Sequence, residues 1–288
     1  MKLKGYLLAL ISAVSYGLIP LFILPVKALH FPLDTTLFYR FFISALFILV
    51  FLIYKKESLK INRTEFLILS VLGLLYALSS DFLFWDYELL TPGIASTVLF
   101  VYPVFVALIL ALFFKEKITR FTFISLLITF SGIVVLSTNG SDFKINFAGL
   151  LVGVSCALFY AIYMVIVNKA KMNVSGIKIT FYSLLFSAVY YLVKTLSLRE
   201  PLAPSPELIL HISVFALVTT VFSITALIYA IKFIGSTPTS IMGALEPVVA
   251  VLISVCCFGE ILTWNLIFGV LLILAGVIFN MVFENRKH

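Results

Sequence analysis

Long apolar runs alternate with short polar links along the whole chain of 288 residues. Each run extends for about 20 residues, which is the length that an α-helix needs to cross the hydrocarbon core of a bilayer. Charged residues concentrate in the links, and no stretch resembles a soluble domain. The pattern predicts an all-α integral membrane protein with ten transmembrane helices, at residues 5–25, 36–54, 66–90, 93–114, 119–138, 147–168, 178–196, 208–233, 237–258 and 262–283.

One stretch of the sequence occurs twice. Residues 103–119 read PVFVALILALFFKEKIT, residues 247–263 read PVVAVLISVCCFGEILT, and seven of these 17 aligned positions are identical. The offset is 144 positions, half the length of the chain, and Gly132 and Gly276 repeat with the same spacing. A repeat of this length in an apolar chain indicates a membrane transporter built from two related halves rather than a solenoid.

The duplication divides the ten predicted helices equally. Residues 1–144 form the first repeat, with helices one to five, and residues 145–288 form the second, with helices six to ten. Five crossings leave the chain on the opposite side of the membrane, so the second repeat starts on the other side and is inverted relative to the first. We therefore expect two inverted five-helix repeats.

The basic residues indicate which side of the membrane each link occupies. With the N-terminus inside, cytoplasmic segments hold 15 lysines and arginines and external segments hold 4, while Arg40 falls within a helix. The positive-inside rule then places both termini in the cytoplasm, and we expect the protein in the cell (plasma) membrane. The cytoplasmic set is Lys2, Lys4, Lys55, Lys56, Lys60, Arg63, Lys115, Lys117, Arg120, Lys169, Lys171, Lys178, Lys232, Arg286 and Lys287, and the external set is Lys27, Lys144, Lys194 and Arg199.

Composition narrows the possible functions. Hydrophobic residues make up 62% of the chain and charged residues 11%, against about 25% charged residues in soluble domains, so the lipid bilayer must solvate most of the surface. The net charge of +7 lies in the links and calls for no nucleic-acid partner. The sequence carries no ATP-binding loop, dinucleotide fingerprint, hydrolase elbow or cysteine spacing typical of a metal site. We expect no cofactor, no metal and no catalytic residue.

Glu246 is the strongest candidate for a substrate-binding or proton-coupling residue. It lies about nine residues into the predicted helix 237–258, near mid-membrane, where a carboxyl group is costly and therefore commonly functional. Pro247 follows it and removes a backbone donor, which can break the helix locally. The aligned position in the first repeat is Tyr102. The duplication therefore places a phenol and a carboxyl group around the pseudo-two-fold axis that relates the two repeats. The alternative is a structural acid between the two halves.

Tyr16 and Tyr160 also occupy equivalent positions in the two repeats. Small residues precede both at helical spacing, and such stripes let neighbouring helices approach closely. The two tyrosines could line a central cavity with Glu246 and Tyr102, or they could be packing residues.

Arg40 lies about one turn into the second predicted helix, and Asp81 and Asp86 lie in the third at a similar depth. An ion pair of Arg40 with Asp81 or Asp86 would serve either as a gate or as a permanent bridge, and we favour the structural role because buried pairs often only fix geometry. Leu184 stands 144 positions after Arg40, so the arginine is not duplicated.

Glu116 and Glu260 repeat as well, but each stands at a membrane surface just before a predicted helix. A carboxylate there interacts with the positive end of the helix dipole, which predicts a structural role. Thr119 and Thr263 stand where they would cap the same two helices.

Three sequence elements carry a resemblance to a known family. Two segments run from a proline to a glutamate and on to a glycine, and one short element joins aromatic residues to an arginine: Pro103…Glu116…Gly132, Leu245-Glu246-Pro247…Glu260…Gly276, and Phe38-Tyr39-Arg40-Phe41. With these elements the whole chain resembles the drug/metabolite transporter superfamily, specifically its EamA family. The resemblance implies ten helices in two inverted repeats and the transport of amino acids, other small metabolites, drugs or sugar phosphates.

These observations predict a secondary transporter or exporter of small metabolites, such as amino acids, related compounds or drugs, that works by alternating access around a central cavity. We expect a monomer or a weak homodimer. The alternatives are an intramembrane enzyme and a non-transporting membrane sensor. Asp81 and Asp86, the best acids for an enzyme, lie five positions apart on one helix and do not easily face each other, and a sensor would need no second inverted half.

Overall fold

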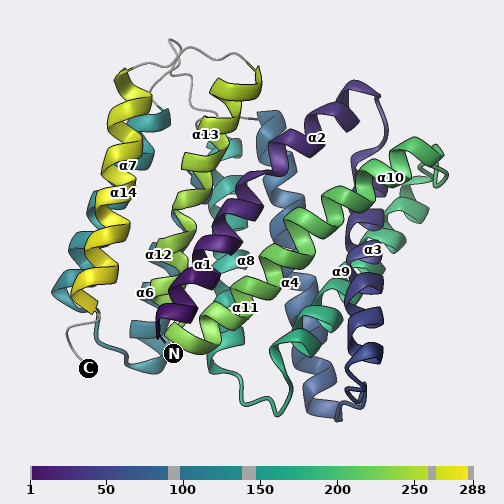
Figure 1. Cartoon of the computed structure of the whole chain (residues 1–288), viewed down its shortest axis with the longest axis horizontal. Helices are drawn as coiled ribbons and strands as arrows, with labels where there is room; N and C mark the ends of the chain where they lie inside the picture. Colours follow the sequence, from purple (N-terminus) through teal and green to yellow (C-terminus); the bar gives the residue numbers. More distant parts are fainter. Residues whose placement is uncertain (1, 90–97, 138–146, 259–263, 285–288) are drawn as a thin grey trace.

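The computed structural model describes residues 2–89, 98–137, 147–258 and 264–284, and all regular secondary structure in these ranges is helical (Figure 1). The helices are α1 (Lys2–Gly17), α2 (Ile19–Ala28), α3 (Leu33–Tyr54), α4 (Arg63–Leu89), α6 (Tyr102–Phe114), α7 (Arg120–Ser137), α8 (Phe147–Lys169), α9 (Gly176–Leu198), α10 (Pro206–Phe215), the π-helix η1 (Ala216–Phe222), α11 (Ser223–Ile234), α12 (Ser236–Gly243), α13 (Leu245–Phe258) and α14 (Trp264–Glu284). Glu260 and Thr263 lie outside the described residues.

The protein is an all-helical, multi-pass membrane protein. Within the described ranges, six helical segments are long and apolar enough to cross a bilayer, and shorter apolar helices lie in three further predicted spans. Large apolar side chains face outward, with Leu112 and Phe113 exposed at 74% and 77%, as expected where lipid is the solvent. Crossing by all ten predicted spans remains a prediction. The six segments are Lys2–Ile23, Leu33–Tyr54, Arg63–Asp86, Phe147–Lys169, Gly176–Leu198 and Pro206–Ile234.

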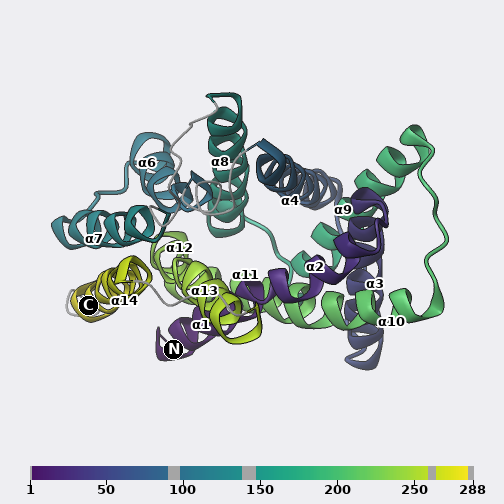
Figure 2. The same cartoon turned by 90° about the horizontal axis from the view of Figure 1, so that it is seen from above.

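The helices form two facing rows. One row contains α14, α13, α1, α11 and α10, and the other contains α7, α6, α8, α4 and α9, as the view from above shows (Figure 2). The most extensive contacts between helices are those of α7 with α14, α3 with α9, α4 with α8, and α1 with α11. The pairs α7–α14 and α3–α9 lie at opposite ends of the molecule, so the buried centre lies between them.

In the described residues, at least three helices that the sequence predicts as continuous are interrupted. The predicted helix 5–25 breaks at Leu18 into α1 and α2, and the predicted helix 237–258 breaks at Ala244 into α12 and α13. Pro20 and Pro247 lack the amide that would bond to the carbonyl four residues earlier, which weakens the helix at both places. The third interruption is the wide turn η1, which lies between α10 and α11.

Buried polar contacts recur at the repeat offset. The Ser223 hydroxyl donates to the Ser12 carbonyl oxygen at 3.1 Å, and this contact joins α1 to α11. The positions 144 residues away are Ser79 and Cys156, and the Ser79 hydroxyl donates to the Cys156 carbonyl oxygen at 3.3 Å. The second contact joins α4 to α8, so equivalent helices in the two repeats pack through equivalent residues.

The repeated glycines allow α7 and α14 to touch. A Cβ atom added at Gly132 would stand 2.8 Å from both the Gly269 carbonyl oxygen and the Ile273 amide nitrogen, and one added at Gly276 would stand 2.9 Å from the Thr129 amide nitrogen. Thr129 and Ile273 are themselves 144 positions apart. Each glycine therefore makes room for the backbone of the other repeat.

Just before η1, equivalent residues of the two repeats are 143 rather than 144 positions apart. The Ser44 hydroxyl donates to the Ala216 carbonyl oxygen at 3.3 Å, and the Ser187 hydroxyl donates to the Gly73 carbonyl oxygen at 2.8 Å. These are equivalent contacts, but Ser44 and Ser187 are 143 positions apart, as are Gly73 and Ala216. The offset returns to 144 at Ser79 and Ser223, so the extra residue of the second repeat lies within η1. A π-helical turn is the usual form of a single-residue insertion in an α-helix.

We predict that Gly132→Val lowers the thermal stability of the purified protein in detergent, because the new side chain would press on the α14 backbone. Overpacking of this kind costs about 1–3 kcal/mol. The matched control is Ser131→Val, on the exposed face of the same helix. Equal melting temperatures for the two variants would contradict close packing of α7 on α14.

Candidate functional site

Three helix ends meet in the centre of the bundle. Tyr102 is the first residue of α6, Glu246 is the second residue of α13, and Gly17 is the last residue of α1. A Cβ atom added at Gly17 would stand 2.9 Å from the Glu246 carbonyl oxygen and 2.7 Å from Cβ of Val249. The glycine thus lets the end of α1 rest directly on the start of α13, where Glu246 is positioned.

Glu246 and Tyr102 reach the same small space. Gly243, the last residue of α12, leaves room that the Tyr102 hydroxyl occupies, and Oε1 of Glu246 lies 3.5 Å from where a Cβ atom on Gly243 would be. Both side chains are buried, with Glu246 exposed at only 7%. The carboxyl also lies in the first turn of α13, where unpaired backbone amides favour negative charge.

Tyrosines from both repeats surround this carboxyl. The rings of Tyr102 and Tyr160 meet edge to face at 4.9 Å between centroids. Tyr16, Tyr102 and Tyr160 all lie close enough to Glu246 for its charge to act on their hydroxyl groups. The structure therefore brings together all four residues that the sequence singles out for substrate binding or coupling.

Two further tyrosines extend the cluster. The ring of Tyr163 lies parallel to that of Tyr160 at 6.3 Å, and the ring of Tyr76 lies 5.6 Å from that of Tyr163. Sequence reasoning missed both residues. The positions 144 residues away are Thr220 for Tyr76 and Ile19 for Tyr163, so the repeat carries no signal for either of them.

Arg40 lies beside Tyr16. Its Nε donates to the Thr220 hydroxyl of η1 at 2.6 Å. Its guanidinium carbon stands 4.6 Å from the ring centre of Phe215 and 5.9 Å from that of Tyr16. Cation–π contacts of this length stabilise a desolvated guanidinium. The side chain is 1% exposed and is held by α1, α10 and η1.

The predicted pairing of Arg40 with Asp81 or Asp86 is wrong. Asp81 instead accepts from Lys194 Nζ at 2.7 Å and from the Tyr190 hydroxyl at 2.6 Å. The same lysine nitrogen lies 3.0 Å from Asp34. The physical reason is the direction of each side chain: Asp81 faces α9, whereas Arg40 faces η1.

Asp86 lies apart from both of these groups. It is fully buried, and neither carboxyl oxygen has a hydrogen-bond partner. A Cβ atom added at Gly153 of α8 would stand 2.5 Å from Oδ2 of Asp86. Asp86 therefore packs at the α4–α8 contact rather than beside Arg40.

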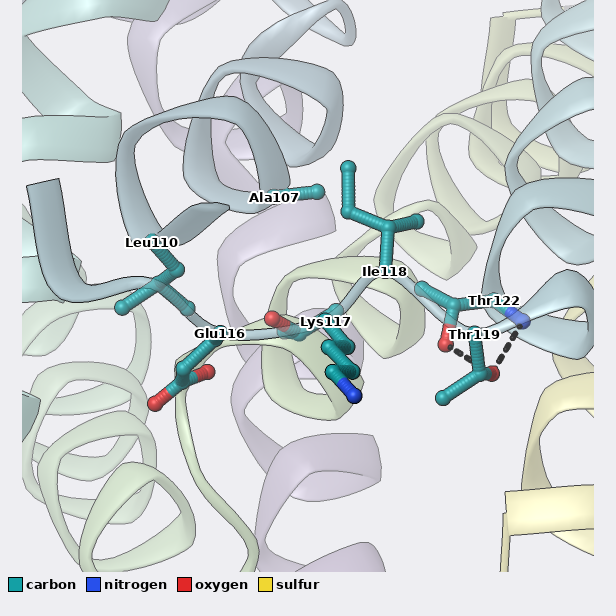
Figure 3. Close-up of a pocket in the computed structure, with 8 residues that line it drawn as sticks. Ala107, Leu110, Glu116, Lys117, Ile118, Thr119 and Thr122 are labelled. Atoms are coloured by element: carbon teal, nitrogen blue, oxygen red, sulfur yellow. Dashed lines mark hydrogen bonds between the residues drawn. The ribbon is translucent and has the colours of Figure 1, made fainter. Parts of the chain in front are cut away.

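The repeated Glu116 lies at one end of the bundle, away from the central tyrosines. It forms an ion pair with Lys169 at the end of α8. The Thr119 hydroxyl accepts from the Thr122 amide at 3.1 Å, which confirms the predicted cap at the start of α7. A pocket of about 60 Å³ adjoins this link (Figure 3) and is lined by Ala107, Leu110, Glu116, Lys117, Ile118, Thr119, Thr122 and Thr237. A space of this volume holds only a few water molecules and not a metabolite.

Interrupted helices and a buried acid at the centre of a membrane-spanning bundle are typical of membrane transporters. The model of the EamA-like transporter family matches this chain twice, over residues 3–138 and over residues 147–282. The chain therefore belongs to the EamA-like transporter family, whose fold has an internal repeat, and it is a small-molecule transporter rather than an enzyme.

Relatives in several bacteria support this assignment. The chain is 25% identical to the uncharacterized transporter YdfC of Bacillus subtilis over 69% of this chain and 65% of that protein. It is 28% identical to the S-adenosylmethionine uptake transporter of Rickettsia conorii over 87% of this chain and 85% of that protein. A crystal structure 18% identical in sequence superimposes with a TM-score of 0.81 over 98% of both chains, so the two share the fold.

We predict that Lys194→Met destabilises the protein, because Asp34 and Asp81 would face each other without the ammonium group between them. Lys194 is 32% exposed, so solvent screening limits the expected loss to about 1 kcal/mol. Thermal unfolding in detergent measures the effect, and adding Asp81→Asn to Lys194→Met should recover part of it. Lys171→Met, at an exposed lysine, is the matched control. An unchanged melting temperature for Lys194→Met would show that the network contributes nothing.

Proposed function

We propose that the protein is a secondary transporter of small polar or amphipathic metabolites that works by alternating access around the central tyrosine cluster. The observation that carries this proposal is the convergence of Glu246 with Tyr16, Tyr102 and Tyr160 at three helix ends. Broken helices at the middle of a bundle expose backbone groups and dipole ends to a bound solute. The two halves would then rock about this fixed site.

We further propose ten spans in two inverted repeats, with both termini in the cytoplasm of the cell. In support, α1 starts and α14 ends at the same end of the bundle, where α3 also ends and α9 begins (Figure 1). Basic residues of the described links gather at this end, which favours the cytoplasmic side. They include Lys55, Lys56, Lys60, Lys115, Lys117, Lys169 and Lys171.

Relatives suggest the first solute to test. Four proteins named S-adenosylmethionine uptake transporters, all from Rickettsia species, are 26–28% identical to this chain. S-Adenosylmethionine carries a sulfonium cation, and cations are bound by aromatic faces and carboxylates. A site made of Glu246 and tyrosines suits a solute with a cationic part, and S-adenosylmethionine and amino acids are the compounds we would test first.

We predict that Glu246→Gln leaves the fold intact but reduces transport at least about tenfold or flattens its pH dependence. Glutamine keeps the size and hydrogen-bonding reach of the side chain, while the titratable proton and the negative charge at mid-membrane are lost. The measurement is solute uptake into proteoliposomes across a pH series, beside wild type and Glu207→Gln, an exposed glutamate on α10. A wild-type rate with an unchanged pH profile would make Glu246 a structural acid.

We predict opposite labelling of single cysteines placed at Ser58 and Ala203, in a background without the native cysteines. Both positions are exposed in links of the described chain. In intact cells, a membrane-impermeant maleimide should label the cysteine at 203 and reach the one at 58 only after lysis. Labelling of both on the same side would contradict the proposed topology.

A further inference from the structure

Arg40 uses little of its hydrogen-bonding capacity. A guanidinium group has five N–H donors, and in the described part of the chain the guanidinium of Arg40 makes one hydrogen bond, from Nε to Thr220. Its Nη2 is buried and has no partner. The ion pairs of the described residues involve Lys169 and Lys194, so this buried cation has no carboxylate partner there. Burying an unpaired charge is costly, which calls for an explanation beyond packing.

Other buried polar atoms without a hydrogen-bond partner begin at Tyr76, on which the charge of Arg40 acts, and continue to Tyr163, whose ring lies 5.6 Å from that of Tyr76. The hydroxyls of Tyr76, Tyr163 and Ser183 are all buried and make no hydrogen bond of ordinary geometry. The charge of Arg40 acts on both Tyr16 and Tyr76. Buried polar groups in native proteins nearly always have partners, so these open hydroxyls and Nη2 of Arg40 call for a polar partner that the described chain does not supply.

The surroundings of Arg40 fix its direction. Thr220 holds the Nε edge, and the rings of Phe215 and Phe41 lie 4.6 Å and 5.5 Å from the guanidinium carbon. Thr220 belongs to η1, where the second repeat has its extra residue. π-Helical turns are frequent at functional sites. The arginine is thus oriented in advance, with Nη2 still available.

The two repeats differ in charge at this centre. Arg40 belongs to the first repeat, and at the local offset of 143 its counterpart is Ser183, not Leu184 as the uniform offset of 144 predicts. Glu246 belongs to the second repeat, and its counterpart is Tyr102. The first repeat therefore contributes a cation and the second an acid, and the charges of both act on Tyr16.

We propose that Arg40 binds a carboxylate group of the transported molecule, while Glu246 and the tyrosines receive its cationic part. The site then selects dipolar solutes by charge at both ends. Arginine is suited to this role because its planar donors match a carboxylate and form charge-assisted hydrogen bonds. This inference rests on the proposed transport function and adds a binding role to a residue that the sequence suggests is structural.

Matched pairs of probes test the proposal. Proteoliposomes would be loaded with S-adenosylmethionine or with decarboxylated S-adenosylmethionine, and separately with phenylalanine or phenethylamine, which form the same kind of pair. Counterflow would be measured for wild type, Arg40→Gln, Thr220→Val and Arg63→Gln. Arg63 is exposed at the start of α4 and is the control arginine. Thermal unfolding in detergent confirms that each variant is folded.

The proposal expects wild type to prefer the carboxylated member of a pair, and Arg40→Gln to reduce its transport at least about tenfold. The decarboxylated member should change less than about twofold. Thr220→Val keeps the charge but frees its direction, so it should raise KM for the carboxylated probe with little change in kcat. Arg63→Gln should behave as wild type.

Several outcomes would overturn the proposal. If Arg40→Gln lowers both members of a pair equally, the arginine acts through the fold and not through the carboxylate. If Arg40→Gln does not fold, Thr220→Val decides the question. An unchanged KM of Thr220→Val for the carboxylated probe would also show that the arginine does not act through the carboxylate. If wild type transports the decarboxylated member as well as its partner, the inference fails although transport stands. If wild type moves none of the probes, the assigned solute class is wrong, and a survey of other metabolites then tests the transport function separately.

Discussion

The cost of holding charge inside a low-dielectric bundle is the constraint on which the centre of this molecule depends. A charged side chain at membrane depth needs donors, dipoles or a partner to replace water. Glu246 lies in the first turn of α13, where backbone amides lack intrahelical partners. Arg40 has Thr220 and aromatic rings. Each arrangement requires a helix that is not regular, so the interruptions at Ala244 and in η1 are part of the site.

Symmetry is kept where the repeats pack and is lost at the centre of the bundle, where we propose that a solute binds. Gly132 and Gly276 play reciprocal roles in the α7–α14 contact, and the serine and cysteine contacts of α1 and α8 are equivalent. These contacts only have to hold two similar halves together. At the centre, Glu246 stands where the first repeat has a tyrosine, and Arg40 stands where the second repeat has a serine. Unlike groups of this kind suit the asymmetric solute that we propose.

The sequence predicts the helical class and the grouping of Glu246 with three tyrosines because these signals lie within single helices or in the repeat. Apolar length predicts membrane helices, and repeat-equivalent positions such as Tyr16 and Tyr160 come together about the axis between the halves. The partners of Arg40 and Asp81 could not be predicted, because they depend on the rotation of each helix about its own axis. Lys194 illustrates this point: it counts as an external charge in the sequence, yet it joins Asp34 and Asp81 in the structure.

The π-helical turn is the feature that apolar periodicity could least reveal, because one extra residue barely changes the pattern of a long apolar run. Its effect on packing is local. The Ser44 contact with Ala216 precedes the extra residue and the Ser223 contact with Ser12 follows it, and both match contacts in the other repeat. Between them, the wide turn presents Thr220 to Arg40. A single inserted residue can therefore change the chemistry at the centre of the bundle while the two halves keep the equivalent packing that the proposed alternating access requires.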